Sequence, residues 1–123
     1  MRALGRIYVE GNTQSHELRL VYAATGATAA SVLWTPAGGT HNQIKYATLP
    51  APVILAANTE YYLVSKETAD GDMSYGDNTR ITIAAAAGVL GSSYSDDGSM
   101  WWRYGAFGSY GYGPLDLKYC ELR

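Results

Sequence analysis

Apolar and polar side chains alternate along most of the chain, in short runs separated by Gly, Asn, Asp and Pro. The alternation is clearest over residues 17–23, where Leu18 and Leu20 fall on one face and Arg19 and Val21 on the other. A period of two is typical of a strand with one buried face. The same pattern predicts strands over residues 4–10, 17–23, 28–34, 43–49, 53–55, 60–66, 80–86 and 114–122.

Two short segments depart from the strand pattern. Four alanines at residues 84–87 predict a short helix from Ile83 to Val89, because alanine is the best helix former, and Gly88 limits its length. Ala24, Thr25 and Gly26 predict a tight turn between two strands, because glycine adopts positive φ without steric cost.

The spacing of these elements predicts the fold class. Short strands with turn residues every 8 to 12 positions are typical of an all-β, antiparallel β-sandwich, here with a jelly-roll-like topology. Helices do not alternate with strands, so the pattern does not favour a parallel α/β sheet. The length of 123 residues fits one domain over residues 1–123.

Composition narrows the classes of partner. Charged residues make up 16% of the chain, the net charge is −2, and no run of Lys or Arg exists, which disfavours nucleic acid and anionic membranes as partners. No apolar run approaches the roughly 20 residues of a membrane-spanning helix. The single cysteine, Cys120, excludes an internal disulfide and a multi-cysteine metal site, and we expect it to be packed or half-buried.

The segment from Tyr94 to Tyr112 concentrates aromatic and glycine residues. Because glycine-rich chain cannot build a core of its own, these rings must pack on the sandwich, on each other or on a ligand. Neighbouring side chains of an extended strand point to opposite faces, so one of Trp101 and Trp102 faces away from the core. Sugar rings have apolar C–H faces that stack on aromatic rings, so this segment favours a saccharide as the ligand.

The predicted binding residues are therefore five rings, two polar neighbours and one more distant tyrosine: Trp101, Trp102, Tyr104, Tyr110, Tyr112, Asp97, Arg103 and Tyr75. The alternative is that these rings cap one end of the sandwich or form a subunit interface. In that case the domain is a structural or adhesion spacer without a glycan site.

A second segment carries oxygen ligands at alternate positions. Asp70, Asp72 and Asp77 partly match the start of a calcium-binding EF-hand loop, and they predict a structural calcium site. The segment departs from that motif at Tyr75, where glycine is usual, and at Ile81, where a bidentate glutamate is usual. The alternative is a solvated hairpin loop.

Catalytic motifs are missing, so we expect a chain that binds and is not an enzyme. The sequence has no G-x-S-x-G nucleophile elbow and no phosphate-binding glycine loop. Its only histidines are His16, expected to hydrogen-bond the backbone of a turn, and His41, expected to be exposed in a loop. A small hydrolase would need a Ser–His pair or two carboxylates converging in one pocket.

Two segments resemble a known class of domain. Residues 11–16 (Gly-Asn-Thr-Gln-Ser-His), followed by Leu18-Arg19-Leu20, and residues 52–65, which include Glu60-Tyr61-Tyr62-Leu63, are similar to hallmarks of secreted bacterial β-sandwich domains. The resemblance covers residues 4–67 and implies an extracellular accessory module, similar to carbohydrate-binding modules, within a larger enzyme or surface protein. Asn58 stands where those domains have glycine, and asparagine tolerates the positive φ of that turn.

The leading functional hypothesis combines these observations. We expect a non-catalytic, polysaccharide-binding accessory module that holds sugar by aromatic stacking and by hydrogen bonds from polar loops. We expect it to be secreted as one module of a larger protein, as the resemblance implies. A strand pattern begins at once, so we do not expect the first residues to form a signal peptide, and in an exported protein this chain is an excised module or a mature form.

Overall fold

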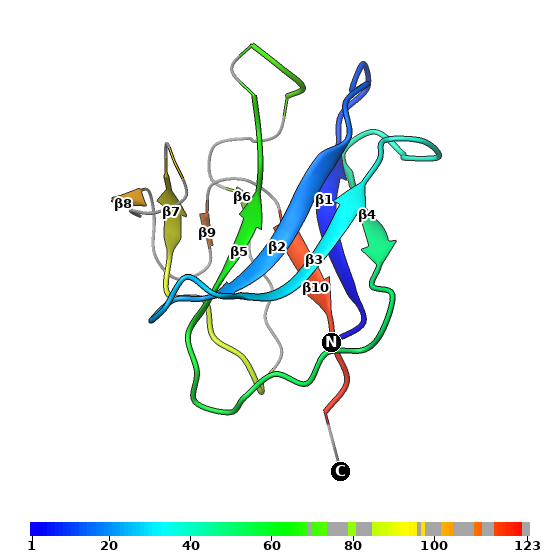
Figure 1. Cartoon of the computed structure of the whole chain (residues 1–123). Coiled ribbons are helices and arrows are strands. Elements are labelled where there is room, and N and C mark those ends of the chain that lie inside the picture. Colours follow the sequence, from blue (N-terminus) through cyan, green and yellow to red (C-terminus); the bar gives the residue numbers. More distant parts are fainter. Residues whose placement is uncertain are drawn as a thin grey trace. The chain divides into compact units, whose positions relative to one another are not determined.

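The computed structural model shows an all-strand chain (Figure 1). It describes residues 1–68, 70–73, 79–80, 85–95, 97, 102–104, 110–111 and 115–121. The chain divides into unit 1, Met1–Ser74 with Leu115–Arg123, and unit 2, Tyr75–Pro114. Unit 2 is therefore inserted in the sequence of unit 1. No described segment forms a helix with the length and hydrophobicity that crossing a bilayer requires.

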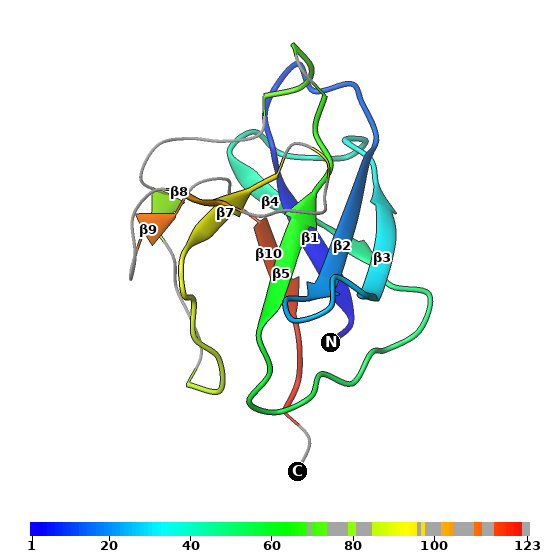
Figure 2. The same ribbon diagram turned by 60° about the vertical axis from the view of Figure 1, so that its left-hand side comes forward.

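Unit 1 contains two antiparallel sheets of three strands each. The first has the order β10-β1-β4, with β10 at Leu115–Lys118, β1 at Ala3–Tyr8 and β4 at Gln43–Thr48. The second has the order β3-β2-β5, with β3 at Thr28–Trp34, β2 at His16–Tyr22 and β5 at Tyr61–Ser65. Figure 2 shows β3, β2 and β5 in front of β1 and β4.

The hydrophobic core of unit 1 lies between these two sheets. Leu4 of β1 meets Leu18 and Leu20 of β2 and Trp34 of β3, and all four are at most 2% exposed. Leu115 and Leu117 of β10, together with Tyr119, pack against this cluster, whereas Asp116 and Lys118 are exposed. The predicted alternation is confirmed for β10, and for β2 as far as Leu20. The register shifts after Leu20, and Val21, predicted on the face opposite the leucines, is also buried at 4% exposure. The architecture is sandwich-like. The jelly-roll topology stays a prediction.

The described residues of unit 2 form two small antiparallel ribbons. In the first, β6 (Thr79–Arg80) pairs with β9 (Tyr110–Gly111). In the second, β7 (Ser92–Tyr94) pairs with β8 (Trp102–Tyr104). These strands have two or three residues each, whereas the strands of unit 1 have four to seven.

The strands predicted for unit 1 are confirmed within two residues at most ends, except the one over residues 53–55. This segment is irregular, although the Val53 N–H donates to the Met1 carbonyl and the Met1 amino group donates to the Val53 carbonyl. Pro50 and Pro52 have no N–H, so the pairing at Val53 cannot extend into a ladder. Of the strand predicted over residues 80–86, Arg80 is strand, residues 85–86 form a turn, and residues 81–84 lie outside the described residues.

The predicted helix over residues 83–89 is also wrong in its described part. Residues 85–86 form a turn and residues 87–89 are irregular, and all of them are exposed. Four alanines supply helix propensity but no apolar face, and nucleating an isolated turn of helix is unfavourable.

The predicted turns are confirmed where the structure describes them. Gly26 has a φ of 73° and closes the turn between β2 and β3, where its N–H donates to the Tyr22 carbonyl at 2.7 Å. Asn58 has a φ of 51°, which is the left-handed conformation expected for its position.

Candidate functional site

The β7–β8 ribbon of unit 2 brings together part of the predicted aromatic site. Its register places Tyr94 opposite Trp102 and Ser92 opposite Tyr104. Directly opposed positions of an antiparallel pair belong to the same face, as do positions two apart along one strand. Three aromatic positions, Tyr94, Trp102 and Tyr104, therefore share one face of this ribbon.

The other predicted binding residues are distributed around it. Arg103 pairs with Ser93, at positions that belong to the opposite face of the ribbon. Asp97 lies in the connection between the two strands, is exposed, and accepts a 3.5 Å hydrogen bond from the Ser95 hydroxyl. Tyr110 lies in β9 opposite Arg80. Trp101, Tyr112 and Tyr75 lie outside the described residues.

Tyr94 is the position that sequence reasoning did not select for the site. The available signal was the dipeptide Asp97-Gly98, a common turn sequence, which lies midway between Tyr94 and Trp102. A hairpin centred there pairs Tyr94 with Trp102. The alternation of neighbouring side chains along one strand, which was the argument applied to Trp101 and Trp102, does not indicate this pairing.

The predicted calcium segment is described at two of its three aspartates. Asp72 is almost buried, with a side chain 6% exposed, and it accepts hydrogen bonds from the backbone N–H groups of Thr13 (3.0 Å) and Gln14 (2.8 Å). Its Oδ2 also lies 3.3 Å from Nε2 of His16. Burial opposes ionisation of Asp72, but these hydrogen bonds outweigh it and lower its pKa below the ordinary value.

Asp72 therefore already has protein partners for both carboxylate oxygens. Asp70 is exposed with a φ of 57°, and Asp77 lies outside the described residues. Within the described ranges, no cluster of three or more His, Cys, Asp or Glu side chains has the arrangement of a metal site. A calcium ion bound by Asp70, Asp72 and Asp77 stays a prediction.

A buried polar cluster lies at the same end of unit 1. The Arg6 guanidinium, which is fully buried, donates two hydrogen bonds to the Glu67 carboxylate at 2.8 and 2.9 Å. It also donates to Oδ1 of Asn12 at 3.1 Å and lies 4.9 Å from the centre of the Trp34 ring. His16 completes the cluster, with its Nδ1 3.0 Å from the Lys66 carbonyl.

These contacts join the loop before β2 to the segment after β5. The predicted backbone contact of His16 is confirmed. His41, predicted to be exposed in its loop, is exposed and accepts a hydrogen bond from the Glu10 N–H at 3.0 Å. Because Arg6 and His16 are almost inaccessible to water, the cluster fixes the structure of unit 1 and offers little surface to a ligand.

The outer face of the β10-β1-β4 sheet carries a second polar contact. The Tyr46 ring lies against Gly5, its hydroxyl donates to the Asp116 carboxylate, and Lys118 Nζ lies 4.0 Å from the ring centre. Partial burial raises the pKa of Tyr46 to about 12, and the Asp116 carboxylate beside its hydroxyl adds to the shift. The three side chains connect the two edge strands across β1.

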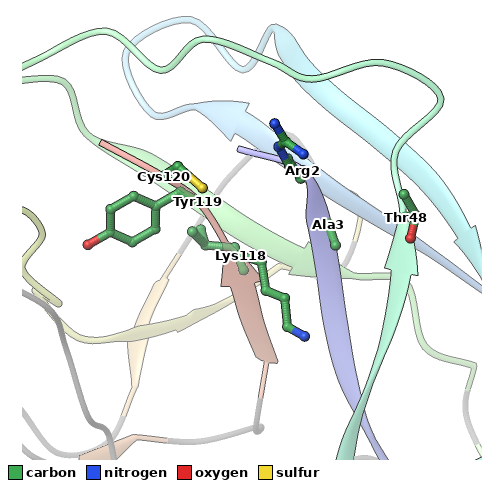
Figure 3. A pocket seen from close by; sticks show the side chains of 7 residues that line it. Arg2, Ala3, Thr48, Lys118, Tyr119 and Cys120 are labelled. Carbon is green, nitrogen blue, oxygen red and sulfur yellow. The ribbon is translucent and has the colours of Figure 1, made fainter. Parts of the chain in front are cut away.

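An open surface pocket of about 580 Å³ lies at one end of this face, lined by Arg2, Ala3, Thr48, Leu117, Lys118, Tyr119 and Cys120. Figure 3 shows that the Arg2 and Lys118 side chains extend away from each other, so their charges do not converge on one point. Cys120 is exposed, and the expectation that its thiol is packed or half-buried is wrong.

Comparisons with protein-family models, with curated proteins and with solved structures each find no match to this chain.

Proposed function

We propose that this chain is a non-catalytic, carbohydrate-binding accessory module, and that unit 2 binds the sugar. The observation that carries the proposal is the register of the β7–β8 ribbon, in which Tyr94, Trp102 and Tyr104 occupy one face. Three aromatic positions on one face of a ribbon provide a stacking surface for the apolar face of one or two sugar rings.

Polar residues beside the ribbon complete the proposed site. Asp97 in the connecting loop is an acceptor for sugar hydroxyls, and Arg103 is a donor. Trp101, Tyr110, Tyr112 and Tyr75 are further candidates for stacking. The low charge of the chain suits a neutral polysaccharide, because neither partner then has to neutralise the other.

The proposed setting is extracellular. We infer that the chain is one module of a larger bacterial enzyme or surface protein and that unit 1 has a jelly-roll-like sandwich topology. The resemblance of residues 4–67 to secreted accessory domains supports both inferences.

The test is affinity electrophoresis of the purified chain through gels that contain a panel of polysaccharides, followed by titration with oligosaccharides of the retarding polymer. Trp102→Ala removes a large stacking surface, which is worth roughly 2 kcal/mol or about a thirtyfold loss of affinity. Tyr104→Ala is expected to give a smaller loss of the same kind. Circular dichroism then checks that both variants keep the fold.

The matched control is Ile54→Ala, which removes an apolar side chain that is 75% exposed on unit 1. Its affinity should equal that of the wild type. If no polysaccharide retards the chain, the spacer or adhesion hypothesis replaces this one. If a polysaccharide binds but Trp102→Ala and Tyr104→Ala both bind it normally, the site lies elsewhere.

A further inference from the structure

Strand β3 forms one edge of the β3-β2-β5 sheet (Figure 2). Alternate residues of an edge strand direct their N–H and C=O groups away from the sheet. Among the described residues, no backbone group outside the sheet bonds to those of Thr28–Trp34. Thr28, Ser31 and Leu33 of this strand are exposed, Leu33 by 64%.

This edge lacks the features that usually protect a strand from pairing. Its seven residues, Thr-Ala-Ala-Ser-Val-Leu-Trp, include no charged residue and no proline. The edge strands of the other sheet are different: β4 carries Lys45, and β10 carries Asp116 and Lys118. At the opposite edge of its own sheet, β5 is also uncharged but has only five residues. The longest edge strand of unit 1 is therefore an unprotected one.

We propose that β3 is a homodimer interface, in which it pairs antiparallel with β3 of a second copy of this chain. A two-fold axis at Ser31 places that residue opposite its own equivalent. The same register places Ala29 opposite Leu33 and Ala30 opposite Val32. The three strands of each copy then form one continuous six-stranded sheet. This inference does not depend on the glycan site.

The properties of the strand favour a second copy as the occupant. An open edge accepts only an extended strand that offers its own backbone donors and acceptors, and β3 is such a strand. Self-pairing brings no like charges together, because β3 has none. It also covers the exposed Leu33 with the small Ala29 of the partner, so the largest exposed apolar side chain of the edge gains contacts without a clash.

The first test uses the two-fold axis itself. In a Cys120→Ser background, which removes the exposed native thiol, Ser31→Cys places two thiols directly opposite each other. Opposed Cα atoms in an antiparallel pair are roughly 4.5 to 5.5 Å apart, within the range that a disulfide spans. Mild oxidation should therefore convert most of the protein to a covalent dimer on a non-reducing gel. The control Ile54→Cys, which is also exposed but lies outside β3, should remain mostly monomeric.

The second test measures the association directly. Sedimentation equilibrium of the whole chain should show a reversible monomer–dimer equilibrium. Leu33→Lys places a charge on each side of the interface and should raise the dissociation constant by roughly tenfold or more. Ile54→Lys, which adds the same charge elsewhere, should leave it unchanged. A chain that is monomeric at every concentration, or a dimer that Leu33→Lys leaves intact, overturns the proposal. So does equal cross-linking of the Ser31→Cys and Ile54→Cys variants.

Discussion

The two units of the chain differ in what holds their strands in place. Unit 1 has strands of four to seven residues, a hydrophobic core between two sheets and a buried cluster around Arg6 and His16. The described strands of unit 2 have two or three residues, and its segment 85–90 exposes Val89 and Leu90. Unit 2 nevertheless carries the aromatic ribbon that we propose as the binding site.

This difference predicts that the residues that stabilise the fold and the residues that bind a ligand lie in different units. A core residue in unit 1 has most of its surface covered by neighbours, so its replacement affects the free energy of unfolding. Apolar side chains that remain exposed in unit 2 gain little from folding and are available to a ligand. Substitutions in unit 1 should therefore change stability, whereas substitutions in the ribbon should change binding.

The largest effect is expected for Trp34→Ala. Trp34 is fully buried between the sheets and contacts both Arg6 and His16. Its removal should lower the free energy of unfolding by about 3 to 5 kcal/mol, because the site cannot close over so large a cavity. The comparison is Leu90→Ala in unit 2, which is 57% exposed and should cost about 0.5 kcal/mol or less. Urea unfolding followed by circular dichroism measures both, and equal losses would contradict the contrast.

The Arg6–Glu67 pair comes next. Arg6→Met leaves the Glu67 carboxylate without the two hydrogen bonds from Arg6, although it keeps the one from the Ser65 hydroxyl, and should cost about 3 kcal/mol. The double variant Arg6→Met/Glu67→Met should lose less than the sum of the two single variants, because it removes both charges. Urea unfolding of all four proteins gives the coupling energy. Additive losses would show that the two side chains contribute independently.

Substitution of Gly5 should have a smaller effect on the free energy of unfolding, and this effect comes from contacts with two named side chains. A Cβ atom on Gly5 would lie 2.5 Å from Cγ2 of Ile44 and 2.9 Å from Cδ1 of Tyr46. Gly5→Ala should therefore cost about 1 to 3 kcal/mol, as overpacking does. The matched control is Gly88→Ala in unit 2, where a Cβ atom meets nothing within 4 Å. There the change should be neutral or should stabilise by up to about 1 kcal/mol.

The smallest expected effect is the pH dependence of stability that comes from Asp72. Because the pKa of Asp72 is lower in the folded chain than its ordinary value of 3.8, the unfolded chain binds its proton more readily. The stabilisation from Asp72 is therefore complete above about pH 4 and is lost as the pH falls through the lower folded value. Asp72→Asn should flatten the decrease in melting temperature between pH 5 and about pH 2. Asp70→Asn removes the same charge from an exposed position and should keep the steep decrease of the wild type.

The sequence predicts unit 1 well because local rules decide its elements. Leu18 and Leu20 are buried and alternate with the half-buried Arg19, so the period of two indicates the buried face of the strand, although Val21 on the other face is buried as well. Asn58 was expected to adopt positive φ because the domains that the chain resembles have glycine at that turn and asparagine tolerates this conformation, and its φ is 51°. These features depend on neighbours in sequence, which is why a single sequence contains them.

The parts that the sequence does not predict depend on distant residues. The burial of Arg6 was not predicted, because its partners include Glu67 and Trp34, which are distant from it in the sequence. Similarly, Asp72 reads as a calcium ligand until the N–H groups of a distant loop occupy its oxygens. The candidate ribbon lies between these cases, since its two strands were not predicted although an Asp-Gly turn marks their midpoint.

The pairing of β1 with β10 bears on how this chain folds. Ala3 lies opposite Lys118 and Arg6 lies opposite Leu115, so one side of β1 is paired only by β10, whereas β4 pairs with the other side. Contacts this far apart in sequence form slowly, because the intervening chain must first be drawn into a closed loop. During synthesis, the β10 edge of β1 stays vacant until β10 itself leaves the ribosome. A chaperone that shields β1 during that interval would raise the yield of native protein most of all in variants with a longer unit 2.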